Sequence, residues 1–308
     1  MKNSLYAVLL LTLTTIMTMT SANAALRVFA CEPEWAAVAR EIGGDKVETT
    51  SATTPDQDVH YIQARPSLIA QVRRADLVFC TGADLEVGWL PVLLRQAGNG
   101  KVQPGQLGFM DAASAVQLLE VPTSVDRSQG DIHPYGNPHL QTDPRNIGKV
   151  AAALSERLAK LDPSNAGYYT QREHDFALNW NRAVEKWTEE AKPLRGMQIV
   201  THHRGYVYLD NWLGLEELGS LEPKPGIEPT TGHLVELLDQ VHNKNAKAIV
   251  RSSYEDSRAS DWLSGRTGVK AIVLPHTVGS VPGTDTLYGM FDVIVARLLD
   301  AEKSAVKK

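Results

Sequence analysis

Apolar and polar positions along the chain follow a rhythm that predicts strands alternating with helices. Short apolar runs that read as buried strands lie at 26–31, 75–80, 198–203, 246–251 and 271–274. In the stretch 146–160, apolar residues instead recur every three or four positions, as on a helix with one buried face. Asp143 and Pro144 supply that helix with an N-cap and a first-turn proline. The alternation predicts an α/β fold with mainly parallel sheets flanked by helices.

The rhythm breaks at 164–190, where the pattern predicts one long helix. Its apolar face carries Phe176, Trp180, Val184 and Trp187, with charged residues opposite. About 25 residues at ~1.5 Å each span ~37 Å, which is about the breadth of a domain. We therefore expect two lobes, residues 25–163 and 193–308, each with its own sheet and joined by a rigid connecting helix at 164–192.

The N-terminus has the pattern of a secretory signal peptide covering residues 1–24. Lys2 precedes an apolar run at 5–19, and the small residues Ser21-Ala22-Asn23-Ala24 suit cleavage. The run is too short and too rich in threonine for a membrane span, which needs about 20 apolar residues. No cysteine follows the cleavage position, so we expect no lipid anchor. A Gram-negative cell would hold such a protein free in the periplasm.

Composition narrows the classes of partner. The chain of 308 residues has 36 Asp and Glu against 31 Lys and Arg, and the signal peptide contains only Lys2 of these. A mildly acidic chain without a basic stripe argues against nucleic acid as a partner. Its average apolar content supports cores that need no metal to fold, and we expect a monomer.

Two cysteines, Cys31 and Cys80, each end a strand-like run. The first and third strands of a doubly wound sheet are commonly neighbours, so the two sulfurs could meet. Secretion permits a disulfide between them, with two buried thiols as the alternative. A thiolate metal pair is disfavoured because the spacing matches no zinc motif.

Three histidines and one aspartate stand where strand-like segments change to helix-like ones. His60 follows a strand-like run at 47–52, His139 precedes the helix at 146–160, His203 ends the run at 198–203, and Asp285 precedes a last helix at 286–303. In open α/β sheets, ligands collect outside the carboxyl ends of strands. Three imidazoles and a carboxylate are a suitable ligand set for a closed tetrahedral zinc site.

Other histidines among the nine compete with these candidates. His202 precedes His203, and on a strand only one of the two can face the cleft. His133 lies in the polar segment 121–137, which predicts a mobile loop beside the site, and is a candidate accessory metal contact. The remaining histidines are expected to face water (His174, His233, His242) or to be structural (His276).

The same residues resemble the motifs of a known family, the periplasmic metal-binding proteins of zinc and manganese ABC importers. This cluster includes the ZnuA-type and AztC-type zinc binders. The matching motifs are His60 ahead of Ala75-Asp76-Leu77-Val78, Pro138-His139 with Asp143-Pro144-Arg145-Asn146, His203 eleven residues before Gly214-Leu215, and Asp285-Thr286-Leu287-Tyr288. The resemblance covers the mature chain and favours His139 over His133 and His203 over His202. Two departures are Gln141, where an aromatic residue is usual, and a loop at 121–137 that is not rich in histidine.

The resemblance implies a two-lobed binding protein that holds Zn²⁺ as cargo between His60, His139, His203 and Asp285. Its implied partners are the membrane permease of an ABC importer and a periplasmic zinc chaperone. A carboxylate in the place of His203 would suit Mn²⁺, whereas three nitrogens and one oxygen favour Zn²⁺.

Three alternatives stay open beside zinc import. The first is a protein of the same fold that binds manganese or another divalent metal, and the second is an adhesin or storage protein. The third is a secreted zinc hydrolase, which needs an open coordination position and a general base. The chain has no His-Glu-x-x-His sequence, and a closed four-ligand shell has no water to activate. We therefore expect a protein that is not an enzyme.

Overall fold

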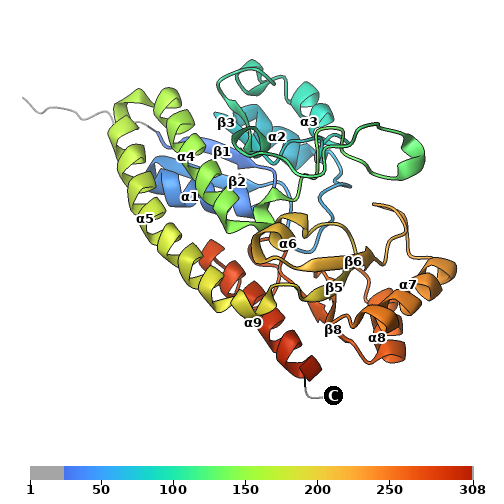
Figure 1. The fold of residues 1–308 in the computed structure, drawn as a ribbon. Coiled ribbons are helices and arrows are strands. Elements are labelled where there is room, and N and C mark those ends of the chain that lie inside the picture. The colour runs from blue at the N-terminus through green and yellow to red at the C-terminus, as the bar shows by residue number, and fades with distance from the viewer. Residues whose placement is uncertain (1–23, 307–308) are drawn as a thin grey trace, which may run out of the picture.

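The computed structural model describes residues 24–306, so most of the predicted signal peptide lies outside the described residues. Two parallel sheets of four strands form the framework, with helices packed around them (Figure 1). The strand orders are β2-β1-β3-β4 and β6-β5-β7-β8. The strand that comes first in the sequence of each lobe, β1 or β5, therefore lies inside its sheet, and later strands are added on both sides of it. The predicted α/β fold with two mainly parallel sheets is confirmed.

The N-terminal lobe is built on the first sheet. Its elements are β1 (Leu26–Ala30), α1 (Pro33–Gly43), β2 (Val47–Ser51), α2 (Pro66–Arg74), β3 (Leu77–Cys80), α3 (Leu90–Ala97), β4 (Phe109–Asp111) and α4 (Pro144–Leu161). The Asp143 side chain caps α4 by accepting a hydrogen bond from the Arg145 amide at 2.8 Å, as the sequence predicts. Pairing of Ala30 with Phe79 places the next residues, Cys31 and Cys80, side by side, and their predicted disulfide is confirmed.

The C-terminal lobe repeats this arrangement after a long helix. Its elements are β5 (Gln198–Thr201), α6 (Val207–Leu213), β6 (Glu216–Ser220), α7 (Thr231–Lys244), β7 (Ala248–Arg251), α8 (Arg258–Thr267), β8 (Lys270–Val273) and α9 (Leu287–Val306). The long helix is α5 (Ala166–Glu190), which matches the helix predicted at 164–190. None of the helices in the described part is both long and apolar enough to cross a membrane.

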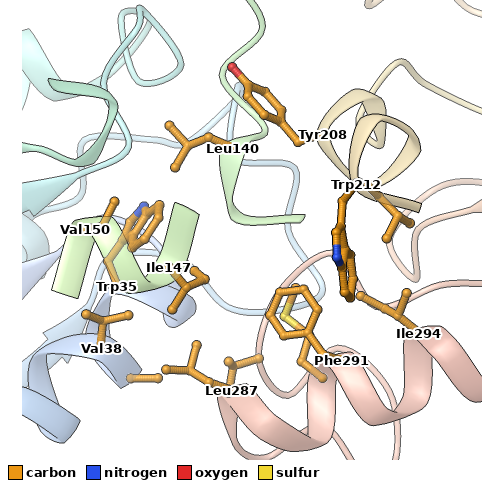
Figure 2. Close-up of a cluster of buried hydrophobic side chains, with 14 of the residues drawn as sticks. Trp35, Val38, Leu140, Ile147, Val150, Tyr208, Trp212, Leu287, Phe291 and Ile294 are labelled. Carbon is orange, nitrogen blue, oxygen red and sulfur yellow. The ribbon is translucent and has the colours of Figure 1, made fainter. Parts of the chain in front are cut away.

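Helix α5 runs along one side of both lobes, and α9 lies against it (Figure 1). The buried side chains between them belong to a single cluster that continues from one lobe into the other. Figure 2 shows Trp35 and Ile147 on the side of the N-terminal lobe, with Trp212 and Phe291 facing them from the C-terminal lobe. This shared core fixes the relative position of the two sheets, whose carboxyl edges hold the loops described next.

Candidate metal centre

Three of the four predicted ligands meet between the lobes. His60 lies in the loop between β2 and α2, His139 directly precedes the short 3-10 segment η5 (Leu140–Thr142), and His203 follows β5. One ligand nitrogen from each ring lies within 4.8 Å of the others, and the Nε2 atoms of His139 and His203 are 3.1 Å apart. Two loops of the N-terminal lobe and one of the C-terminal lobe therefore build one compact group of imidazoles.

Carboxylates orient two of the three rings. The Nδ1 atom of His60 lies 2.7 Å from Asp58 Oδ1, and that of His203 lies 2.7 Å from Glu222 Oε2. A carboxylate acceptor favours the tautomer with the proton on Nδ1, which leaves Nε2 with a free lone pair. The Nε2 atom of His60 is buried and has no hydrogen-bond partner among the described residues. In this tautomer both rings direct a nitrogen lone pair towards the centre of the group.

His139 is held by its backbone rather than by its ring. Its amide donates to Asn137 Oδ1 at 3.0 Å, and its carbonyl accepts from the Thr142 hydroxyl at 3.0 Å. The residue is only 7% exposed, and burial, together with the neighbouring His203 and His60, holds its pKa well below the usual range. The ring therefore stays neutral, which is the form that binds a metal ion.

The structure does not bring the fourth predicted ligand, Asp285, to this group. Asp285 is exposed and lies outside the set of clustered donor atoms. The reason is the turn before it, in which the Gly279 amide donates to the Thr284 carbonyl at 2.7 Å and reverses the chain. The assignment of Asp285 as a neighbour of the three histidines is corrected accordingly.

His276 was assigned a structural role, yet it lines a small cavity together with His139 and His203. Its Nδ1 atom is buried without a hydrogen-bond partner among the described residues, and burial lowers its pKa to about 4. The signal in the sequence was its position shortly after the β8 strand, at the same edge of the sheet where His203 follows β5. From this strand end the structure therefore brings His276, and not Asp285, to the cavity that His139 and His203 line.

His133 also approaches the group from the segment 121–137. Its ring centroid is 5.6 Å from that of His60, and its Nε2 atom is buried without a partner among the described residues. The segment crosses to the C-terminal lobe, where the Asp131 amide donates to the Pro225 carbonyl at 2.9 Å. The Tyr61 hydroxyl donates to the Asp131 carboxylate from the other side. These contacts hold the loop across the mouth of the histidine group.

Behind the histidines lies a set of buried carboxyl groups that the sequence did not reveal. Glu32 and Glu34 line the cavity of about 30 Å³ that His139 and His276 also line, and Glu86 lies beside Glu32. Burial, followed by the charges of Glu86 and Glu34, raises the pKa of Glu32 well above its usual range. Burial also raises the pKa of Glu34 to about 7. Both shifts favour the protonated, uncharged form, so this wall of the site adds little negative charge near neutral pH.

Replacing Glu32 with glutamine is expected to stabilise the protein at pH 8 and to have little effect below about pH 4.5. The raised pKa means that ionising Glu32 costs more in the folded than in the unfolded state, so its penalty grows as pH rises above the unfolded value. The amide avoids this penalty and can still accept the hydrogen bond from Thr81 Oγ1, which is 3.1 Å long. Thermal unfolding of both proteins without metal at the two pH values measures the difference.

The control is Glu48→Gln, because Glu48 is exposed on β2. Titration of the histidines is common to all three proteins and cancels when each variant is compared with the parent. A stability gain of Glu32→Gln that is equal at both pH values would contradict the pKa argument.

Comparison with known proteins places this geometry among metal-binding proteins. Residues 28–301 match the family described as "ZnuA: Zinc-uptake complex component A periplasmic". The manganese ABC transporter substrate-binding lipoprotein PsaA of Streptococcus pneumoniae is 24% identical, over 79% of this chain and 77% of its own. The high-affinity zinc uptake system protein ZnuA of Yersinia pestis is 25% identical, over 67% and 69%.

A solved structure described as a crystal structure of ZnuA has the same fold. It superposes with a TM-score of 0.77 and covers 90% of this chain and 99% of its own. At 19% sequence identity, this likeness concerns the arrangement of the two lobes and not the choice of metal.

Proposed function

Because the chain belongs to the ZnuA family of periplasmic metal-binding components of ABC importers, we propose that it captures Zn²⁺ between its lobes and delivers it to a membrane permease. The observation that carries this proposal is the group of His60, His139 and His203, whose ligand nitrogens lie within 4.8 Å of one another. Proteins of this family bind and hand over a metal ion without converting it, so the chain is a binding protein and not an enzyme.

Zinc is proposed over manganese because of the donor atoms. Imidazole nitrogens suit Zn²⁺, whereas a site for Mn²⁺ is richer in carboxylate oxygens. The relatives named above include a protein named for manganese and one named for zinc, so the argument for zinc rests on His203 and its neighbours. Glu222 and Asp58 hydrogen-bond to the far side of two rings, which raises the basicity of the metal-facing nitrogens.

We propose His133 or His276 as the fourth donor of the site, with Asp285 as the alternative that the sequence suggests. His133 and His276 each have a buried ring nitrogen without a partner among the described residues. Asp285 is exposed and lies outside the clustered donor atoms, so it would have to move to reach the ion. His60 and His139 belong to one lobe and His203 to the other, so docking on a permease can weaken the site by moving one set of ligands.

We propose that the protein works as a monomer in the periplasm, after removal of a signal peptide and without a lipid anchor. PsaA is named a lipoprotein, but the two cysteines of this chain are joined to each other, so neither thiol is free to carry a lipid. The proposed partners are the permease of a zinc importer and a periplasmic zinc chaperone.

A competition titration of the metal-free mature protein tests the choice of zinc. We expect one equivalent of Zn²⁺ to bind tightly and to remain bound in the presence of a large excess of Mn²⁺. Displacement of zinc by equimolar manganese would overturn the zinc assignment and favour a manganese-binding protein of the same fold. Hydrolytic turnover that depends on His139 would instead favour the hydrolase alternative.

A further inference from the structure

Strand β5 is followed by two histidines whose side chains enter different cavities. His203 belongs to the group of three imidazoles, whereas His202 lines a separate cavity of about 270 Å³ in the C-terminal lobe. This second cavity lies at the carboxyl edge of the sheet, between the first turns of α7 and α8. Glu228, Asp256 and Trp262 are among its other lining residues.

The His202 ring is buried without the partners that a buried imidazole normally has. The residue is 7% exposed, and its Nδ1 atom has no hydrogen-bond partner among the described residues. Buried polar atoms in folded proteins are nearly always hydrogen-bonded, so an unpartnered nitrogen on a residue that lines a cavity fits a ring able to take up a ligand or ion. The three-histidine site does not account for the unpartnered Nδ1 atom of His202, because only His203 of the two adjacent histidines belongs to that site.

Two carboxylates accompany His202 in the cavity. Glu228 and Asp256 both interact electrostatically with the His202 ring. Glu228 is exposed on the loop before α7. Asp256 Oδ1 accepts a hydrogen bond from the Arg258 amide at 2.8 Å and keeps a further lone pair, while Oδ2 is contacted by Nε and Nη2 of Arg258, both at 2.8 Å.

We propose that His202, Glu228 and Asp256 form a second binding site for a divalent transition-metal cation such as Zn²⁺. One imidazole nitrogen and two carboxylates are the donors that such ions take in proteins, with water completing the coordination. The site is distinct from the interlobe group because the two adjacent histidines face different cavities.

Binding at this second site is weaker than between the lobes, for two physical reasons. The three donor atoms are not already clustered in the way those of His60, His139 and His203 are, so the exposed Glu228 side chain must be ordered when the ion binds. The first turns of α7 and α8 line the cavity, and the positive ends of their helix dipoles oppose a cation. The carboxylates offset this opposition only in part, because Arg258 neutralises Asp256.

Zinc titration of the full mature chain carrying His139→Ala tests the proposal with the interlobe site disabled. We expect one weak equivalent of zinc, whose affinity falls by at least about tenfold when Glu228→Gln or His202→Asn is added. Glu236→Gln is the matched control, since Glu236 is exposed on α7 and does not line the cavity, and it should leave the weak site unchanged.

The outcomes are separable from those that test the interlobe site. Loss of tight binding in His139→Ala alone reports on the three-histidine group, while the weak equivalent belongs to the second cavity only if Glu228→Gln weakens it, because Glu228 does not line the interlobe cavities. No zinc binding in the His139→Ala protein, or equal weak affinity with and without Glu228→Gln, would overturn the second site. Glu228 is exposed, so its substitution decides the question even if His202→Asn does not fold.

Discussion

Replacing His139 with alanine is expected to lower the affinity for zinc at the interlobe site by at least about a hundredfold. Loss of a residue that merely supports a metal ligand typically costs about 10–100-fold, and loss of a direct ligand costs at least the upper end of that range. His139 is buried, and its Nε2 atom is 3.1 Å from that of His203, so the substitution removes one of the three clustered nitrogens. Competition against a chelating fluorescent indicator at pH 7.5 measures the change.

The matched control is His174→Ala. His174 is exposed on α5 and does not belong to the loops that hold the three rings, so its removal should leave the zinc affinity unchanged. Equal tight affinities in the parent and in His139→Ala would show that the three imidazoles are not the zinc ligands.

Replacing Phe291 with alanine is expected to lower the free energy of unfolding by about 3–5 kcal/mol. Phe291 on α9 is fully buried, and its ring packs against Trp180 and Trp187 of α5. It also packs against Trp212 of α6 (Figure 2). Truncation removes the contacts of one ring and leaves a cavity between three others, which cannot collapse fully because they are fixed on helices α5 and α6. Chemical denaturation of the metal-free protein measures the loss.

The control is Leu178→Ala on α5, because Leu178 is 47% exposed and its truncation should change stability by no more than about 0.5 kcal/mol. Phe291→Ala protein that is still folded should bind zinc with unchanged stoichiometry, since the ring touches none of the three histidines. A cost below about 1 kcal/mol for Phe291→Ala would contradict the role of this ring in joining the lobes.

The parts of the fold that were predictable are those with a strong periodic signal. Strand β3 is a continuous apolar run, β1 and β5 each contain buried apolar residues in sequence, and α5 carries aromatic residues at helical spacing. The edge strand β6 has the sequence Glu-Glu-Leu-Gly-Ser and is at most half-buried, so no apolar pattern marks it. The short helix α6 has only seven residues, too few for a period to be recognised.

The part of the site that was predictable is the part whose position follows from where the strands end. His60, His139 and His203 meet because each lies in a loop at the carboxyl edge of a sheet, and that edge follows from the strand pattern. Asp285 was misplaced because the turn at 279–284 depends on backbone hydrogen bonds that residue types do not reveal. Asp58 and Glu222 were missed for a related reason: their role depends on side-chain contacts with rings, which no spacing in the sequence encodes.

The uninterrupted apolar packing behind the histidines has a mechanical consequence. Swinging the halves of the molecule widely apart would pull Phe291 away from Trp180 and Trp187 of α5 and expose these rings to water, at a cost of several kcal/mol. The segment 121–137 is bound across the lobes by hydrogen bonds such as those of Asp131, so moving it costs less. An importer that unloads this protein therefore has to move the segment 121–137 while the packing between α5 and α9 stays intact.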